Sequence, residues 1–519
     1  MGRQALKWVT AAASVAWLGG CTALLGLDDK KFDRDEGATS AGGGSVGAGG
    51  AGAGGSGGGP GAVCGLDEVP SAAPRWSAVT TSDMGRTLVG GIAIDETSGD
   101  LWVVGSFQGN VTVQGCAAVA TTSGQAVFWA RLRSADGACE ASGVLGGNDV
   151  ASDHATARGI ALDSGGNAAL VGRFRGSMSA GGTTISSSGD DDMFVIKLDS
   201  TGAPVWAQSY GEAAGDTAEA VVIETADQIF VGGSIGTPTL GDLAVRRIGA
   251  GGSEIFSGAY SSPEEDDRVN AVAFSPSVPF VLTGYIGGDV SLGDLMLTTT
   301  EQNAFVATID TQGAGLRAVA NPGDGVSVGR AAAVTVDGEY VFAAGDFSRK
   351  LDLDGDPGSG GLETLTVDES DGFVVRLDLS KSGAARYAQL GQPADGAGAH
   401  DDHIAAMALD PKTEQSLVVA GSVRGRACFL GAEREAVVGS DDLFVAEVDA
   451  ELNGPLWVSV FGEASGGGDQ SAAAVAIHPT TGDVIVAGTF NGNLNLGTGT
   501  DIMGPRVGTE VFILALERP

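Results

Sequence analysis

The sequence predicts an all-β protein built from one four-stranded unit that repeats along the chain. After Pro70, short segments that alternate branched and small residues recur. Each is followed by a segment that ends in glycine, and these glycines lie about 64 residues apart on average. No segment between them keeps a 3.6-residue apolar period, which excludes a helical repeat.

The composition allows a large core and excludes one class of partner. Hydrophobic residues make up 43% of the 519 residues and charged residues 18%, so the chain as a whole is not expected to be disordered. Asp and Glu number 65 against 29 Lys and Arg, a net charge of −36. This charge repels phosphates, so nucleic-acid binding is excluded.

Four strands are expected in each unit. The first has branched residues on one side and small residues on the other, at 92–95, 160–163, 221–224, 272–275, 334–337, 407–410 and 475–478. The second ends in a glycine with a large apolar residue two positions later. These glycines are Gly105, Gly172, Gly233, Gly284, Gly345, Gly421 and Gly488.

The third and fourth strands are marked by aromatic residues. The third centres on Phe128, Phe194, Phe305, Phe373, Phe444 and Phe512, and the third unit has Ala244 in that position. The fourth is clearest around Trp206 and Trp457, with Phe256 and Tyr387 as looser counterparts.

Such a unit has two apolar faces and cannot bury both alone, whereas radial stacking buries them between neighbours. The sequence therefore predicts a seven-bladed β-propeller of four-stranded antiparallel blades. A count of six stays open, because the loose third unit can be absorbed by a neighbour.

The two ends of the repeat region predict how the ring closes. The seventh unit stops at Pro519 after its third strand, and residues 73–78 are similar to residues 203–208, a fourth strand. We expect 75–80 to pair with 510–516, closing the ring without a covalent bond.

One repeat resembles a known family. Residues 192–199 (Asp-Met-Phe-Val-Ile-Lys-Leu-Asp), followed by Gly202, Trp206 and Tyr210-Gly211, are similar to the bacterial β-propeller repeat called SBBP. The resemblance covers about 445 residues, strongest in the second and sixth units and loose in the third and fourth. It implies a propeller fold and a location in the cell envelope, but no established reaction.

The N-terminus predicts export and a lipid anchor. Arg3 and Lys7 precede a short apolar run, 8–18, typical of a signal peptide. The run ends in Leu-Gly-Gly-Cys at Cys21, which resembles the lipobox of bacterial lipoproteins and implies a lipidated Cys21. The alternative is a plain secretory signal with an incidental cysteine. Thr22 rather than Asp after the cysteine implies the outer membrane.

Residues 37–61 are almost only Gly, Ala and Ser, and are expected to form a flexible tether spanning roughly 25 to 30 Å. The predicted organisation is a signal peptide at 1–20, a lipidated linker at 21–72 and a propeller at 73–519. The protein is expected to be a monomer attached to the membrane through its lipid.

Four cysteines remain in an oxidising compartment. Cys116 and Cys139 flank one expected third strand and are the first choice for a disulfide, which leaves Cys64 and Cys428 to pair or to stay free. Four free thiols are the alternative. The spacing indicates no zinc site.

Two clusters are weak metal candidates. His400, Asp401, Asp402 and His403 form one. The alternative for it is a turn-capping carboxylate, because aspartate recurs in this loop elsewhere, at Asp153, Asp216, Asp267 and Asp469.

The second cluster, Asp352, Asp354 and Asp356, superficially matches a calcium loop that ends at Glu363. Pro357 stands where that loop needs glycine, so we interpret the segment as an enlarged connection between strands. Adventitious Ca²⁺ is the alternative.

Two further groups have competing interpretations. Acidic residues before the third-strand aromatics, at 190–192, Asp371 and 441–442, are expected to form a solvated face. Trp76, Trp206 and Trp457 are interpreted as packing between sheets, with sugar-stacking platforms as the alternative.

For function, we expect a non-catalytic interaction or structural module at the outer membrane, whose partner is a protein or a glycan. No catalytic residue, cofactor or metal is assigned. One alternative is a quinoprotein-like enzyme, because residues 202–206 resemble the Gly-x-x-x-Trp element of those propellers. Another is a hydrolase with a channel site, although no nucleophile and base can be paired from the sequence.

Overall fold

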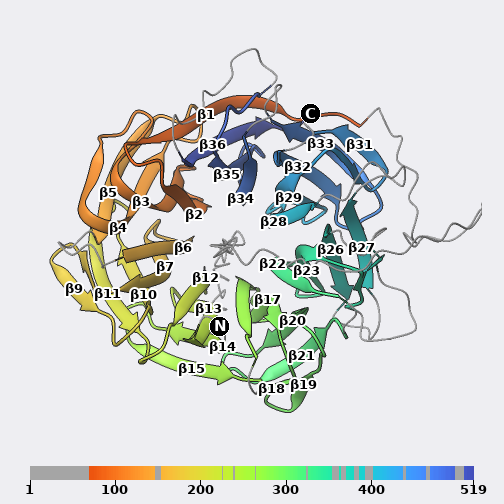
Figure 1. Cartoon of the computed structure of the whole chain (residues 1–519), viewed down its shortest axis with the longest axis horizontal. Helices are drawn as coiled ribbons and strands as arrows, with labels where there is room; N and C mark the ends of the chain where they lie inside the picture. The colour runs from red at the N-terminus through yellow and green to blue at the C-terminus, as the bar shows by residue number, and fades with distance from the viewer. Residues whose placement is uncertain are drawn as a thin grey trace, which may run out of the picture.

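The computed structural model describes residues 69–146, 154–224, 226–237, 240–262, 265–322, 325–353, 362–363, 370–378, 385–391, 401–436, 440–462, 468–496 and 508–519. Every helix or strand in these ranges is a β-strand, so the predicted all-β class is confirmed. Figure 1 shows the sheets arranged around a centre in chain order, in a β-propeller-like way. In the described part of the chain, no helix is both long and apolar enough to span a membrane. The predicted signal peptide, tether, Cys21 and Cys64 lie outside it.

One antiparallel strand order recurs along the chain. The first strands are β2 (Thr87–Ile94), β6 (His154–Leu162), β12 (Thr217–Ile223), β16 (Arg268–Ala273), β22 (Ser327–Val334), β28 (His403–Leu409) and β34 (Gln470–Ile477). They pair with second strands β3 (Leu101–Val113), β7 (Ala168–Arg175), β13 (Ile229–Thr237), β17 (Phe280–Ile286), β23 (Tyr340–Phe347), β29 (Ser416–Val423) and β35 (Val484–Phe490). Consecutive first strands contact one another, and β34 contacts β2.

The outer half of each unit follows the predicted pattern. The third strands are β4 (Val119–Leu132), β10 (Asp192–Leu198), β14 (Leu240–Ile248), β20 (Asn303–Ile309), β26 (Asp371–Asp378), β32 (Asp442–Asp449) and β36 (Glu510–Glu517). The fourth strands are β5 (Cys139–Gly146), β11 (Pro204–Tyr210), β15 (Glu254–Tyr260), β21 (Gly315–Ala320), β27 (Ala385–Gly391), β33 (Pro455–Phe461) and, beside β36, β1 (Ala73–Ser82). Short hairpins lie between second and third strands: β8 (Ser177–Ala180) with β9 (Thr183–Ser186), β18 (Val290–Leu292) with β19 (Leu295–Leu297), β24 (Lys350–Leu351) with β25 (Leu362–Glu363). The pair β30 (Arg426–Phe429) and β31 (Ala432–Glu435) completes them.

A β-bulge interrupts each of these first strands at the same position. The inserted residues, called the bulge residues below, are Gly90, Arg158, Glu219, Asn270, Arg330, Ala405 and Ala473. A bulge leaves one residue unpaired and bends the strand, which redirects side chains. The residue type at this position differs among the units, from glycine and alanine to asparagine, glutamate and arginine.

The bulge explains the column of glycines. In the fifth unit, Gly345 pairs with Phe373 across the sheet, and a Cβ on Gly345 would lie 1.9 Å from the carbonyl oxygen of Val328, just before the bulge. The same pairing joins glycine to phenylalanine in five other units, and joins Gly233 to Ala244 in the third. These positions therefore need glycine for space and not for a positive φ.

The bulge also corrects one sequence prediction. Aligned on Arg330, the first-strand segment of the fifth unit is 332–335 and not 334–337. A shift of two residues keeps the same side chains on the same face of a strand, so the alternation alone could not detect the error.

The expected solvated acidic face is wrong for three residues. Asp192, Asp371 and Asp442 are at most 2% exposed. Asp192 accepts a hydrogen bond from the Ser188 amide at 3.0 Å. Glycines at the ends of the fourth strands make room for these carboxylates, since a Cβ on Gly462 would lie 2.1 Å from Asp442 Oδ1. The acidic residue before the third-strand aromatic therefore contacts the glycine that follows the fourth-strand aromatic in the same unit.

The tryptophan column packs between units. The Trp206 ring nitrogen donates to the Ala250 carbonyl in the next unit at 2.9 Å, and that of Trp76 donates to the Ser134 carbonyl at 2.6 Å. Trp457 is buried and donates to Glu447 at 2.5 Å. Each indole N–H therefore has a partner inside the protein, as the packing interpretation requires.

The N-terminal strand pairs where it was predicted to pair. Trp76 to Val79 of β1 lie opposite Ala515 to Phe512 of β36. Thr80 to Ser82 then cross to the first unit and pair with β3. Thr80 Oγ1, Ser82 N and Ser82 Oγ all donate to the carboxylate of Glu510, at 2.6 to 2.7 Å. One strand thus joins the last unit to the first.

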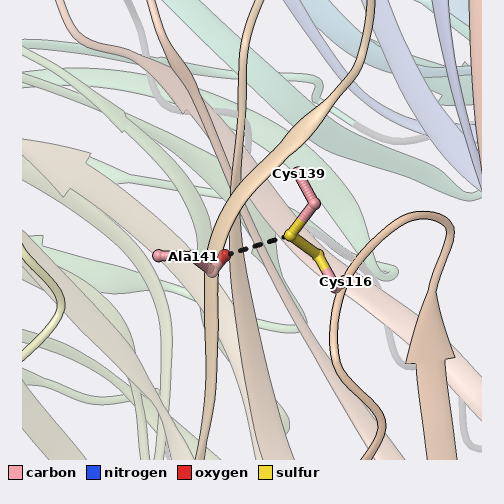
Figure 2. Close-up of a disulfide and its surroundings, with 3 residues drawn as sticks. All are labelled: Cys116, Cys139 and Ala141. Carbon is pink, nitrogen blue, oxygen red and sulfur yellow. Dashed lines mark hydrogen bonds between the residues drawn. A yellow bond between two sulfur atoms is a disulfide. The ribbon is translucent and has the colours of Figure 1, made fainter.

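Cys116 and Cys139 form a disulfide with a Cα–Cα distance of 5.2 Å, the pairing that was the first choice from the sequence. The bond flanks β4, and the Cys139 sulfur lies 3.7 Å from the carbonyl oxygen of Ala141 (Figure 2). It ties the turn before β4 to the start of β5.

Candidate functional site

The bulge residues divide the first strands into a polar side and a small-residue side. Four consecutive units carry Arg158, Glu219, Asn270 and Arg330, and the other three carry Gly90, Ala405 and Ala473. Figure 1 shows the labelled first strands nearest the centre of the molecule. The polar bulge residues and their partners, described next, are our candidate site.

The first charged group, called the Glu219 cluster, joins three units. Glu219 on β12 lies 3.5 Å from Arg158 on β6 and 3.5 Å from Arg268 on β16, and it accepts a hydrogen bond from Thr217 Oγ1 at 3.1 Å. Arg158 and Glu219 are almost fully buried. Burial alone would raise the pKa of Glu219, but the charges of Arg158, Arg268 and Arg173 outweigh it and hold that pKa below its usual value.

The second group, called the Asp346 cluster, joins the fifth and sixth units. Arg330 on β22 donates to Asp346 on β23 with Nη2 3.0 Å from Oδ2, and His403 Nδ1 on β28 lies 3.7 Å from Asp346 Oδ1. Burial would raise the pKa of Asp346, but the charges of Arg330 and His403 hold it well below its usual value. Burial lowers the pKa of His403, and Asp346 more than compensates, so the net shift is upward.

Asn270 completes the polar side. Its Nδ2 donates to the Gly329 carbonyl of the next first strand at 2.9 Å. Side chains from first strands therefore bridge each junction from the second unit to the sixth. Chemically, both carboxylates are held ionised by arginines, which suits electrostatic ties between units better than proton transfer.

The residues singled out from the sequence lie elsewhere or have other partners. Asp402 is buried and accepts a hydrogen bond from the Arg424 amide at 3.1 Å, while Asp401 accepts one from the Ser370 amide at 3.2 Å. His403 belongs to the Asp346 cluster. Asp352 is buried, and its amide donates to Asn321. His400, Asp354 and Asp356 lie outside the described residues.

The capping alternative has direct support. Asp216 accepts hydrogen bonds from the amides of Glu212 and Gly236, and Asp267 from those of Ser262 and Gly287, at 2.7 to 3.0 Å. Asp402 holds the same place, three residues before its bulge residue. Within the described ranges, no group of three or more His, Cys, Asp or Glu side chains is placed to hold a metal ion. The segment of the calcium-loop candidate begins after β24 and ends in β25, and these two strands pair between a second and a third strand, as the predicted enlarged connection requires.

Sequence reasoning missed both charged clusters. Their members are scattered over more than 240 residues, from Arg158 to His403. One signal was present: Arg158, Glu219 and Asn270 each stand two residues before the start of the first-strand segment of their unit, at 160, 221 and 272. Only the bulge shows that this position is special.

Replacement of Glu219 by Gln is expected to destabilise the protein by about 3 to 5 kcal/mol at pH 7, because it leaves the buried Arg158 and the half-buried Arg268 without this carboxylate. Urea unfolding followed by circular dichroism measures this. The control is Glu212→Gln, an exposed carboxylate in the same unit, expected within about 0.5 kcal/mol of wild type. Equal effects in the two variants would contradict the assigned role.

His403 gives a pH-dependent prediction. Since its pKa is raised in the folded state, the stability it contributes is fully present below its unfolded pKa, about 6.5, and is lost as pH rises through the folded value. The stability difference between wild type and His403→Gln should therefore shrink from pH 5.5 to pH 9.

His478 is the matched control for that series. Burial lowers its pKa in the folded state, so wild type should lose stability relative to His478→Gln as pH falls below about 6.5. The two histidines thus predict opposite trends. If denaturation midpoints at several pH values show parallel trends, the electrostatic account of His403 is wrong.

Comparison with known proteins leaves the family open. No protein-family model and no curated protein matches the chain. Among solved structures, quinohemoprotein alcohol dehydrogenase from Comamonas testosteroni is 12% identical with a TM-score of 0.35, covering 87% of this chain and 76% of its own. A mutant apocarotenoid oxygenase from Synechocystis is 11% identical with a TM-score of 0.38, covering 87% and 95%. Sqt1 from Chaetomium thermophilum is 13% identical with a TM-score of 0.33, covering 68% and 92%. Similarities this low assign neither a family nor an activity.

Proposed function

We propose that the chain is a closed seven-bladed β-propeller that acts as a non-catalytic protein-binding module. Lipidated Cys21 and the Gly-rich tether hold it at the outer membrane. Three observations support the closed ring: the recurrent strand order, the contact of β34 with β2, and the pairing of β1 with β36. The SBBP-like repeat and the lipobox-like sequence support the envelope location.

The main support for a binding role is that the strands of each unit are alike, whereas the connections between second and third strands differ. The bulge and the opposing glycine recur in every unit, whereas the connection between second and third strands differs. It is the β8–β9 hairpin in the second unit and the β18–β19 hairpin in the fourth, but only a few residues in the third. Variable loops on a rigid frame are typical of binding proteins.

Exposed apolar residues on these connections favour a protein partner over a glycan. Met296 in the middle of β19 is 61% exposed, and Leu240 at the start of β14 is 49% exposed. Protein interfaces are enriched in methionine and bury apolar surface. Trp457 is buried, and Gly137 and Gly252 lie against the rings of Trp76 and Trp206, so less aromatic surface is free to stack on a sugar.

A photo-crosslinking residue placed at Met296 in the lipidated, full-length chain tests the binding role. We expect a discrete protein adduct in native membranes. The matched control is the same residue at Val205, which is 59% exposed but on an outer strand. Glycan adducts, or equal adducts at both positions, would contradict the proposal. Absorbance of a bound quinone, or alcohol oxidation after addition of pyrroloquinoline quinone, would favour the enzyme alternative instead.

The anchor is tested separately. Cys21→Ser should move the protein from the membrane fraction to the soluble fraction, because its acyl chains are lost. An unchanged distribution would refute lipid anchoring without bearing on the binding role.

A further inference from the structure

Cys428 has a disulfide partner outside the described residues. It lies in β30, opposite Glu433 of β31, and it is disulfide-bonded and 8% exposed. The chain has five cysteines, and Cys116 is bonded to Cys139. Only Cys21 and Cys64 remain as partners.

The described residues just after Cys64 are fastened beside Cys428. The Val69 carbonyl accepts a hydrogen bond from Arg434, whose cross-strand neighbour is Ala427. The Pro70 carbonyl accepts one from the Val458 amide at 3.0 Å, and the Ala72 amide donates to Ser459 Oγ at 2.9 Å. Residues 69–72 are therefore held against β31 and β33 of the sixth unit before β1 crosses to β36.

We propose that Cys64 is the partner of Cys428. Five residues separate Cys64 from Val69, and an extended chain of five residues spans at most about 18 Å. The side chain of Arg434 in β31 reaches the Val69 carbonyl, so Val69 lies close to the β30–β31 hairpin. Five extended residues are therefore long enough to bring Cys64 to Cys428. The exclusion of Cys21 rests on the proposed lipidation, since a sulfur linked to diacylglycerol has no thiol to oxidise. The reach argument does not depend on it.

The chemistry is a two-electron oxidation. The two thiols lose two protons and two electrons and form one S–S bond, and a disulfide of an envelope thiol oxidant accepts them and becomes a dithiol. The product fixes the start of the N-terminal strand to the sixth unit.

Peptide mapping of the wild-type chain tests the pairing. Free thiols are alkylated without reduction, and the protein is digested with trypsin. Cleavage after Arg34, Arg75, Arg426 and Arg434 is expected to give residues 35–75 linked to 427–434. A link between 427–434 and the peptide with Cys21, or an alkylated Cys428, would overturn the proposal.

Four variants separate this inference from the proposed function. Cys64→Ser and Cys428→Ser should lower the urea midpoint by the same amount, and the double variant should lower it no further, because each removes the same bond. Unequal shifts, or a double variant lowered beyond either single one, would contradict the pairing. Cys21→Ser should keep the linked peptide while losing the membrane association. Its loss of the link would instead implicate Cys21.

Discussion

A chain that begins after Ser82 is expected to lose the cooperative thermal unfolding of the full protein. Removal of residues 73–82 takes away β1, the strand that pairs with the outer side of β36. It also removes the partner of β3 at Val111 to Val113. It also exposes apolar side chains of the last sheet and leaves the buried carboxylate of Glu510 without the Thr80 and Ser82 donors. We expect a loss of well over 4 kcal/mol, a level that single substitutions rarely reach. Differential scanning calorimetry measures it.

The matched control begins at Val69. It also lacks residues 1–68 but keeps β1 and the contacts of residues 69–72 with the sixth unit. The full chain with Cys64→Ser is the reference for both, since neither shortened chain has Cys64 and all three keep the Cys116–Cys139 disulfide. A melting temperature of the shorter chain close to that of the control would show that β1 adds little.

Substitution of Gly345 by Ala is expected to be among the most damaging single changes in the sheets. The new Cβ would lie 1.9 Å from the Val328 carbonyl oxygen and 3.1 Å from Gly329 Cα, both backbone atoms that cannot rotate away. The clash can be relieved only if the bulge of β22 moves. Arg330 and the rest of the Asp346 cluster would have to move with it. We expect a cost of about 3 kcal/mol or more, at or above the upper end for overpacked cores.

Gly251→Ala is the control for this substitution. Gly251 lies in the β14–β15 turn, where an added Cβ meets nothing within 4 Å. Its change should be neutral or slightly stabilising, because alanine restricts the unfolded chain. Urea denaturation of both variants decides the matter, and equal midpoints would refute the steric explanation of the glycine column.

Much of the fold could be predicted because it depends on local patterns. The glycines of the second strands and the phenylalanines of the third pair with each other across the sheet, so a recurring spacing in the sequence reports a contact in space. The similarity of 73–78 to a fourth strand predicted a pairing over more than 400 residues for the same reason. Where residues 331–333 are all alanine, the pattern was too weak to set the register.

The candidate site could not be predicted, because it depends on departures from the pattern. A bulge has no sequence signature, so Arg158 and Glu219 gave no sign that they meet. Asp192 and Asp442 precede an aromatic residue at the start of a strand, where a solvated acid is the usual expectation. Their burial depends on a glycine that follows the neighbouring fourth strand and, for Asp192, on the amide of Ser188 in the preceding turn. The sequence also offered His400 and Asp402 as neighbours, while the structure uses Asp402 to cap a turn.

Native-state hydrogen exchange tests most directly whether β1 closes the ring. Mass spectrometry compares peptides that cover Ala73–Ser82 and Glu510–Glu517, the two strands of that pairing. If β1 is an integral strand of the last sheet, the amides of 73–82 that are hydrogen-bonded to β36 or β3 should be protected, and they should exchange together with those of 510–517 on global unfolding. Rapid exchange of 73–82 beside a fully protected 510–517 would contradict the closed ring.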